Sequence, residues 1–357
     1  MSNLQEFTVE NGVLKKYSGK SDEVVIPAGV TSIGGGAFAD CTELTSVVIG
    51  DNVEVIGTEA FANCSNLTSV HIGTGVYELY ARVFDGCDSL TSLTVADGNH
   101  VFHSACNCII DTISGILVAG CGASMIPTDG SVTSIGNFAF SHCKELTEIT
   151  IPDSVRFIGP WAFAGCAALT SLTVADGNPT YHSAGNCIIE TATGKLVVGC
   201  GASVIPVDGS VLSIGDNAFF GRSNLASISI PDGVTSIGED AFSDCSNLTS
   251  ITIPNSVASI GIFAFCGCSS MPSLAIPDSI TSIGDWTFSG CFDLTSIAIP
   301  AGVTNIGDYA FSDCSSLTLI NYAGTKGRWK AIEKEDNWNN RTGDYTVHCV
   351  DGDIQKN

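Results

Sequence analysis

One phrase recurs along this chain at a fixed interval and constrains its fold more than any other feature. It reads S-I-G-x-x-A-F-x-x-C-x-x-L-T-S-I-x-I-P, and copies within a group lie 23 residues apart, while two larger steps measure 56 residues. Its phenylalanine falls at Phe38, Phe61, Phe84, Phe140, Phe163, Phe219, Phe242, Phe265, Phe288 and Phe311. A constant period of this length is typical of one small unit stacked many times, because such a unit cannot bury its apolar face alone.

One copy, around Phe242, shows what the unit encodes. Apolar and polar residues alternate from Ser250 to Ile253, which predicts a strand with one buried face. Pro254 ends that strand because proline has no N–H for the ladder. A second short extended piece is expected at 257–260, followed by a bend at Gly261. The Ala-Phe-x-x-Cys stretch suits a short helical turn.

Stacking these units predicts an α/β-type repeat solenoid. Its 23-residue units would place a parallel sheet on one curved face, with short helical or 3-10 turns and extended segments elsewhere. The phenylalanine rings would stack into a spine inside the solenoid. Because packed side chains would fill the interior, only the outer surface would be available to partners. This favours a binding role over catalysis.

The quoted phrase resembles the leucine-rich repeats of the BspA-like (treponemal-type) family over about residues 5 to 350. Leucine-rich repeats in general carry an asparagine ladder just past the strand, where this chain mostly has glycine or serine, so that ladder is not expected. The resemblance implies a non-enzymatic protein-binding scaffold. It also implies adhesion to host or neighbouring-cell components, such as extracellular-matrix proteins.

The ends and the two long steps predict the domain organisation. Residues 1–30 contain an Asn-Gly turn between short apolar runs and are expected to form a hairpin cap. Residues 31–322 form the solenoid, with two related inserts at about 97–131 and 176–210 that are expected to project as hairpins from its edge. Residues 323–357 change in composition and are expected to form a C-terminal cap with a short amphipathic helix.

The charge balance excludes one class of partner. The formal net charge is −23, and residues 21–322 carry 29 acidic and 5 basic side chains. Nucleic acid binding is disfavoured because contact with phosphates needs a basic surface. The acidic residues just past the strands can be read as a solvated turn edge, as attraction of a cationic partner, or as weak calcium binding. They lack the closely spaced ligands of a calcium loop.

The cysteine and histidine residues form no clear disulfide, metal-binding or catalytic motif. Nine of the sixteen cysteines occupy the repeat position and are expected to be buried thiols. The insert cysteines could pair within each hairpin, for example Cys108 with Cys121. His103, Cys106 and Cys108 could bind zinc, but a structural site needs four ligands and the second insert has Gly185 in place of Cys106. No nucleophile, metalloprotease or nucleotide motif is present, so we expect no enzymatic activity, no metal and no cofactor.

Departures from the repeat pattern supply the candidate partner-binding residues. Exposed strand positions are mostly serine and threonine, and His71 and Glu148 depart from that pattern. Two residues before the spine phenylalanine, several copies carry an aromatic side chain where others do not. These candidates are Phe138, Trp161, Phe263, Trp286 and Tyr309. They are either packed between coils or form an aromatic stripe that contacts protein or glycan.

The expected partner is a protein, with glycan as an alternative ligand class. No stretch is long and apolar enough to insert into a membrane, and residues 1–20 lack the apolar core of a signal peptide. The expected location is therefore the cell surface or the medium if a leader has been removed, and the cytoplasm otherwise. In the second case the chain would be an intracellular interaction or structural repeat protein.

Overall fold

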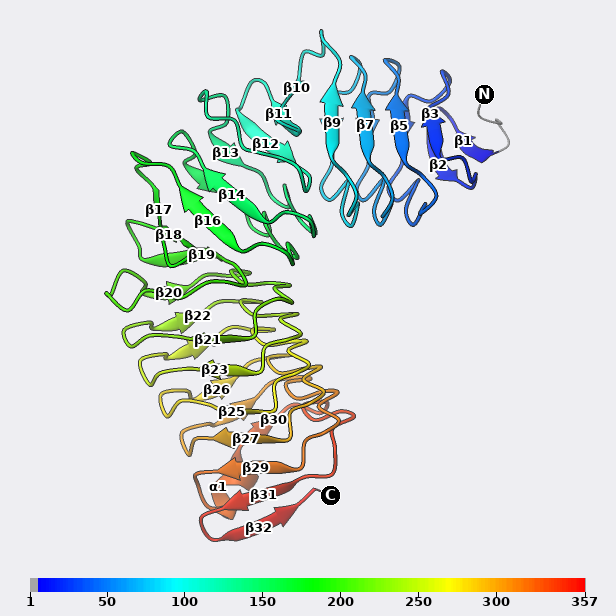
Figure 1. Ribbon diagram of the computed structural model, residues 1–357. Coiled ribbons are helices and arrows are strands. Elements are labelled where there is room, and N and C mark those ends of the chain that lie inside the picture. The colour runs from blue at the N-terminus through cyan, green and yellow to red at the C-terminus, as the bar shows by residue number, and fades with distance from the viewer. Residues whose placement is uncertain (1–5, 357) are drawn as a thin grey trace. The chain divides into compact units, whose positions relative to one another are not determined.

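The structure, a computed structural model, describes residues 6–356. The chain divides into two compact units, and each is described by itself. The first comprises residues 1–169 and 174–180, and the second comprises residues 170–173 and 181–357. Within each unit, successive coils pair their strands in parallel at the 23-residue interval (Figure 1). The repeat solenoid expected from the sequence is therefore confirmed.

The first unit opens with two parallel ladders of strands. One ladder contains β3 (Glu23–Val25), β5 (Ser46–Ile49), β7 (Ser69–Ile72) and β9 (Ser92–Val95). The second contains β2 (Val13–Tyr17), β4 (Ser32–Ile33), β6 (Val55–Ile56) and β8 (Glu78–Leu79), with β1 (Phe7–Glu10) antiparallel to β2. The rest of the unit contains β10 (Phe102–Ala105), β11 (Cys108–Asp111), β12 (Ile116–Ala119), β13 (Ser134–Ile135), β14 (Glu148–Ile151) and β15 (Phe157–Ile158), and β16 (Ser171–Val174) lies at the boundary.

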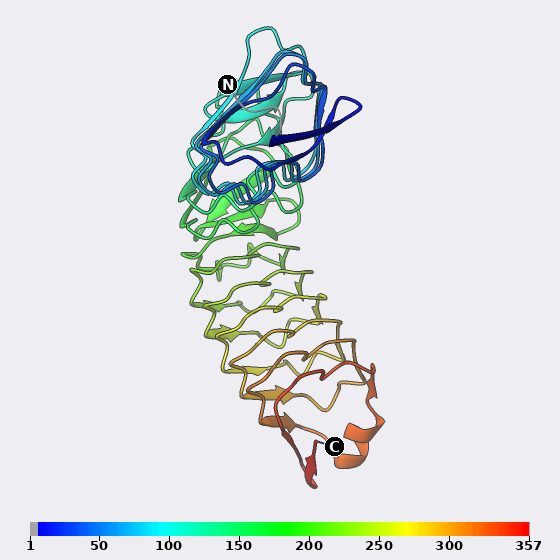
Figure 2. The same ribbon diagram turned by 90° about the vertical axis from the view of Figure 1, so that its right-hand side faces the viewer.

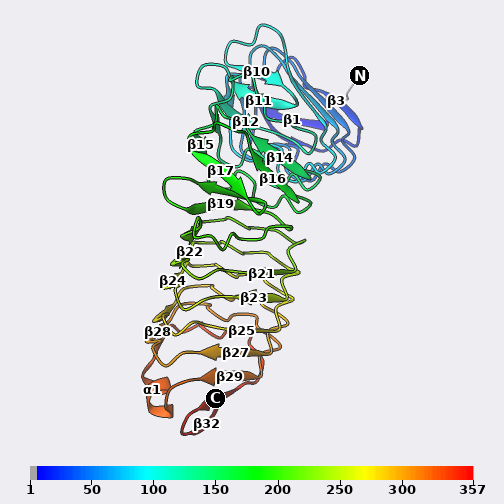
Figure 3. The same cartoon turned by 60° about the vertical axis from the view of Figure 1, so that its left-hand side comes forward.

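The second unit repeats this plan (Figure 2). One of its ladders begins with β17 (Tyr181–Ala184), β18 (Cys187–Glu190) and β19 (Lys195–Gly199) and continues through β20 (Ser213–Ile214), β22 (Ser236–Ile237) and β24 (Ser259–Ile260). Another row, visible in Figure 3, contains β21 (Ser227–Ser229), β23 (Ser250–Thr252), β25 (Ser273–Ala275), β27 (Ser296–Ile299) and β29 (Leu319–Tyr322). The C-terminal end adds β26 (Ser282–Ile283), β28 (Asn305–Ile306), α1 (Lys326–Ala331), β30 (Glu333–Lys334), β31 (Thr346–Cys349) and β32 (Gly352–Gln355).

The inserts do not project as the sequence suggested. Each forms an antiparallel hairpin, β11–β12 or β18–β19, but the second strand of the hairpin also pairs in parallel with the next coil. Leu117 lies opposite Ile135, and Leu196 lies opposite Ile214. At the N-terminus, β2 is bound to β4 in the same way, through Leu14 and Ile33. Each hairpin is therefore a starting coil that belongs to the stack.

The expected helical turns around the phenylalanines, and with them the α/β class, are not confirmed. Within residues 6–356, α1 is the only α-helix. One left-handed residue instead precedes the Ala-Phe-x-x-Cys stretch and another occupies its fourth position, as Asp240 (φ 53°) and Asp244 (φ 56°) do. Alternate N–H groups bond to the next coil, as that of Phe242 does to the carbonyl of Ala264 at 2.8 Å, whereas the N–H of Cys245 bonds within the turn to the carbonyl of Phe242 at 3.2 Å. Because every second N–H group bonds to the next coil, the turn does not continue as a helix.

The core of each coil stack is a row of stacked phenylalanine rings. Ring centroids lie 4.8 Å apart between Phe38 and Phe61, and 5.4 Å apart between Phe242 and Phe265. Other aromatic side chains close the row in the first and last coils. Tyr17 packs on Phe38 at 5.0 Å, and Trp338 meets Phe311 edge-on at 6.0 Å. The predicted spine is confirmed within each group of 23-residue copies.

The repeat cysteine and the repeat glycine both serve the contact between coils. The thiol of Cys245 donates to the carbonyl oxygen of Phe219 in the preceding coil at 3.1 Å, and six further repeat cysteines do the same. All sixteen cysteines are free thiols, so the insert cysteines are not paired. A methyl group on Gly261 would lie 2.5 Å from the backbone nitrogen of Glu239, so glycine is needed there for close approach.

Candidate interaction surface

Three aromatic candidates come together on one flank of the second unit. The rings of Phe263 and Trp286 stack at 5.8 Å, and those of Trp286 and Tyr309 stack at 4.2 Å. All three side chains are half-buried, so part of each ring faces the surface. We call these three residues the C-terminal aromatic stripe. The sequence predicted that these three rings share one flank, and their stacking confirms it. Their role in binding stays a prediction.

Every residue of this stripe has a left-handed backbone. The φ angles are 56° at Phe263, 56° at Trp286 and 53° at Tyr309. The equivalent position holds Gly36 in the first coil and Asn217 in a later one, both residue types that tolerate this conformation. A large aromatic side chain there costs about 1 kcal/mol of local strain. Stacking of the rings stabilises the folded state by about 0.5–1.5 kcal/mol per pair, which offsets this strain.

The first unit holds a second aromatic pair at the same repeat position. Phe138 and Trp161 stack at 6.2 Å, and both are half-buried with positive φ. The guanidinium of Arg82, one repeat position earlier, lies 5.7 Å from the centroid of the Phe138 ring. This cation–π contact ties the coil before the first insert to the coil after it.

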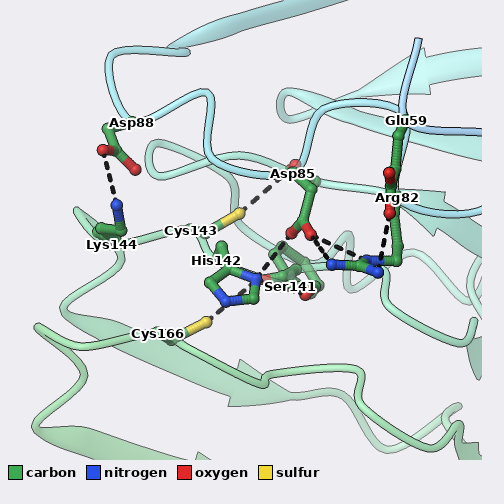
Figure 4. Close-up of polar contacts among 11 residues, drawn as sticks. Glu59, Arg82, Asp85, Asp88, Ser141, His142, Cys143, Lys144 and Cys166 are labelled. Carbon is green, nitrogen blue, oxygen red and sulfur yellow. Dashed lines mark hydrogen bonds and ion pairs between the residues drawn. The ribbon is translucent and has the colours of Figure 1, made fainter. Parts of the chain in front are cut away.

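Arg82 also belongs to a polar cluster that bridges the first insert (Figure 4). It binds Glu59 at 2.8 Å and Asp85 at 2.8 Å. On its other side, Asp85 accepts from Nδ1 of His142 at 2.8 Å, and Asp85 is only 8% exposed. Burial opposes ionisation of this carboxyl, but hydrogen bonds and charge from His142 and Arg82 outweigh it and lower the pKa of Asp85. Lys144 binds Asp88 at 3.1 Å beside this cluster.

The cluster brings a serine, a histidine and a carboxylate together, but not in a catalytic arrangement. Ser141 Oγ lies 3.0 Å from Nδ1 of His142, the same nitrogen that contacts Asp85. A catalytic triad needs the nucleophile on one ring nitrogen and the carboxylate on the other. Ser141 is also buried. The geometry therefore fits a clasp between coils, which the sequence motifs did not reveal because its partners lie 57 residues apart.

The two polar candidates lie on different strands of the first unit. His71 is exposed on β7, between Val48 and Thr94 in the ladder, and its Nδ1 lies 3.0 Å from Thr94 Oγ1. Glu148 is exposed at the start of β14. The structure therefore presents His71 on the exposed strand face, beside Thr94 of the next coil.

The possible zinc ligands are not assembled. His103 contacts Thr112 at 3.0 Å, Cys106 is exposed and Cys108 is buried. Among residues 6–356, no group of three or more histidine, cysteine or acidic side chains has the geometry to hold a metal ion. No helix in this part of the chain has the length and apolar character of a membrane span.

Carboxylates accompany the C-terminal aromatic stripe, a feature that the sequence reasoning missed. Asp285 and Asp308 directly precede Trp286 and Tyr309, and the backbone N–H of Asp308 donates to Asp285 Oδ1 at 2.8 Å. Asp285, Glu333 and Glu335 line a pocket beside β28 and β30. The sequence does contain a pattern that predicts these carboxylates, because the residue before the stripe position is acidic in several copies. These are Asp216, Glu239, Asp285 and Asp308.

At the other end of the stripe lies a buried acid. Asp240 occupies the stripe position one coil before Phe263 and is 9% exposed. Burial, together with repulsion from Glu239 and Asp244, raises the pKa of Asp240 to about 6, although Ser243 donates a hydrogen bond to it. The stripe is thus bounded by acidic side chains on more than one side.

A family model for BspA type leucine rich repeat regions matches this chain over residues 8–114, 111–185 and 199–328. The chain belongs to this family of leucine-rich repeat proteins. Among solved structures, it is similar to a leucine rich cell surface protein from Faecalibacterium prausnitzii A2-165. The two are 30% identical, with 94% of this chain and 96% of that chain covered and a TM-score of 0.61.

The fold is also similar to that of the pneumococcal vaccine antigen PcpA. Identity is 18%, coverage is 92% of this chain and 80% of that chain, and the TM-score is 0.53. No curated protein matches the chain in sequence. The family and the fold together define a repeat scaffold, in which partners meet the outer surface of the coils.

Proposed function

We propose that this chain is a non-enzymatic protein-binding scaffold that acts at the cell surface or in secreted form, in adhesion or host interaction. Membership of a leucine-rich repeat family supports the scaffold role. The location is supported by the Faecalibacterium relative, which is described as a cell surface protein and is 30% identical over nearly the whole chain.

The observation that carries the proposal is the C-terminal aromatic stripe. Tyrosine and tryptophan are enriched among the residues that dominate binding energy at protein interfaces. Trp286 and Tyr309 are half-buried and occupy left-handed positions where glycine or asparagine would cost less. A partner that covers the exposed ring edges would gain contact area with little loss of side-chain entropy, because stacking already fixes the rings.

The test is a binding measurement with a variant that keeps the backbone relaxed. Trp286→Gly combined with Tyr309→Gly removes both rings and leaves glycine at positions where Gly36 shows that it is suited. Surface plasmon resonance against immobilised extracellular-matrix proteins should show binding by the wild type and about tenfold weaker binding by the variant, as expected for the loss of interface anchors. Val207→Ser, which changes an exposed apolar residue outside the stripe, should bind like the wild type.

Two results would contradict the proposal. If the double variant loses thermal stability but keeps its affinity, the stripe is packing between coils only. If the wild type binds a glycan array and no matrix protein, the ligand class is wrong. Labelling of intact cells with an antibody tests the location separately, and signal obtained only after lysis would argue for the intracellular alternative.

A further inference from the structure

The segment that carries the C-terminal aromatic stripe is strongly acidic, although Arg341 of the C-terminal cap lies 3.6 Å from Asp313. Residues 223–325 contain nine acidic side chains and neither lysine nor arginine. These are Asp232, Glu239, Asp240, Asp244, Asp278, Asp285, Asp293, Asp308 and Asp313. The stripe lies inside this segment, where acidic side chains predominate and favour the approach of a cationic partner.

The carboxylates next to the rings are incompletely satisfied. Asp285 is exposed, and one of its oxygens binds the N–H of Asp308. Asp308 Oδ1 is buried and has no hydrogen-bond donor. A carboxylate oxygen in that state costs about 1–3 kcal/mol relative to one that accepts a bond. A small rotation of the half-buried Asp308 side chain toward an incoming donor would remove that cost.

Lys334 of the C-terminal cap does not supply such a donor. Lys334 Nζ donates to the carbonyl oxygens of Trp329 and Ile332 at 2.7 and 3.1 Å and lies over the Trp329 ring at 4.7 Å. Glu333 and Glu335, on either side of it in sequence, are exposed and line the pocket that also contains Asp285. Asp285, Glu333 and Glu335 therefore form an acidic surface beside the stripe that a cationic partner can approach.

We propose that the C-terminal aromatic stripe and its flanking carboxylates bind a basic segment of a partner protein. This inference rests on the proposed scaffold function and specifies the chemistry of the partner. The aliphatic stems of arginine or lysine would lie against the exposed ring edges of Trp286 and Tyr309. Their charged ends would donate to Asp285 and Asp308, and charge-assisted bonds of this kind are stronger than neutral ones.

The experiment uses a fluorescent hexa-arginine peptide as the probe, with hexa-citrulline as its uncharged isostere. Fluorescence anisotropy of the full chain should show binding of hexa-arginine and none of hexa-citrulline. Asp285→Asn with Asp308→Asn, and separately Trp286→Gly, should each weaken the affinity about tenfold. The matched control is Asp232→Asn with Asp278→Asn, which changes the charge equally at exposed turns and should weaken it less than about twofold.

If the two Asp→Asn double variants lose affinity for hexa-arginine equally, the peptide responds to net charge alone and the inference is overturned. It would also be overturned if Trp286→Gly left hexa-arginine binding unchanged. Neither result touches the proposed function, which is tested by matrix-protein binding of the Trp286→Gly/Tyr309→Gly variant. The asparagine pair keeps an acceptor for the Asp308 N–H, so its fold is preserved and its result is decisive even if the glycine variant is unstable.

Discussion

The type of residue at each fixed repeat position is determined by its contact with the preceding coil. Gly261 is required because the backbone at Glu239 leaves no room for a Cβ, and Cys245 because its thiol reaches the carbonyl of Phe219. Burial raises the pKa of Cys245 to about 12, so this thiol stays protonated and remains a donor at neutral pH. One repeat replaces the cysteine with Arg222, which is buried and donates from Nε to the Gly199 carbonyl at 2.8 Å.

Asp240 should make stability depend on pH in the direction opposite to most carboxylates. Burial raises the pKa of this carboxyl to about 6 in the folded state, above the ordinary aspartate value of 3.8, so the folded state binds the proton more tightly than the unfolded chain. Stability should therefore rise as pH falls through about 6 and level off below about 4. Asp240→Asn should remove this slope and stabilise the protein at pH 8 by about 1–3 kcal/mol.

Urea unfolding at pH 4.5 and pH 8 measures this difference. Asp232→Asn, at an exposed turn, serves as the control and should keep the slope of the wild type. If the wild type and Asp240→Asn show the same change in unfolding free energy between the two pH values, the carboxyl is not buried as described.

At the scale of elements, the row of phenylalanine rings holds successive coils together. Phe265 stacks on Phe242 at 5.4 Å and on Phe288 at 5.6 Å, whereas Phe84 ends its group and stacks on Phe61 at 5.8 Å. Beyond Phe84 the apolar core continues through Phe102 and Ile109, and polar contacts of Asp85 with Arg82 and His142 are added there. The same repeat element is thus held by ring stacking inside a group, and by apolar packing together with a charged clasp at the first insert.

Removal of one ring should cost more inside a group than at its end. Phe265→Ala should lower the free energy of unfolding by about 3–5 kcal/mol, because it opens a cavity between two rings that cannot collapse. Phe84→Ala should cost less, since only one ring neighbour is lost. Chemical denaturation compares the two variants, and equal losses would show that the rings do not act as a continuous row.

Sequence reasoning found the strands, the N-terminal hairpin and the ring row, because each depends on local alternation or on the 23-residue period. It placed the insert hairpins wrongly. Their parallel partners lie 18 residues onward, as Leu117 and Ile135 do, and this spacing falls outside the repeat period. It also expected helical turns, because the left-handed residues beside the phenylalanine, such as Trp286, are of types that rarely adopt positive φ.

At the scale of the whole molecule, charge is the dominant collective property. Thirty-seven acidic and fourteen basic side chains give the net charge of −23. Such an excess keeps the molecule soluble, but it opposes compaction through self-repulsion. Each compact unit must therefore gain its stability from the dry interior and not from surface charge.

Salt should therefore stabilise this protein. When NaCl is raised from about 0.02 M to about 0.5 M, the Debye length falls from about 20 Å to about 4 Å and repulsion between surface carboxylates is screened. The midpoint Tm should rise, as measured by circular dichroism, while sucrose at equal osmolality provides the control for excluded-solute effects. A fall in Tm would show that ion pairs such as Arg82–Asp85 contribute more than the repulsion.

The amino-acid sequence determined the architecture, because a 23-residue period with one apolar face can bury itself only by stacking on copies of itself. It also identified which side chains stand on the flank, since Phe263, Trp286 and Tyr309 share one repeat position. Tertiary structure alone decided what surrounds them. The clasp of Asp85 with His142, the burial of Asp240 and the unpaired oxygen of Asp308 all depend on distances between different coils, and a one-dimensional pattern does not contain those distances.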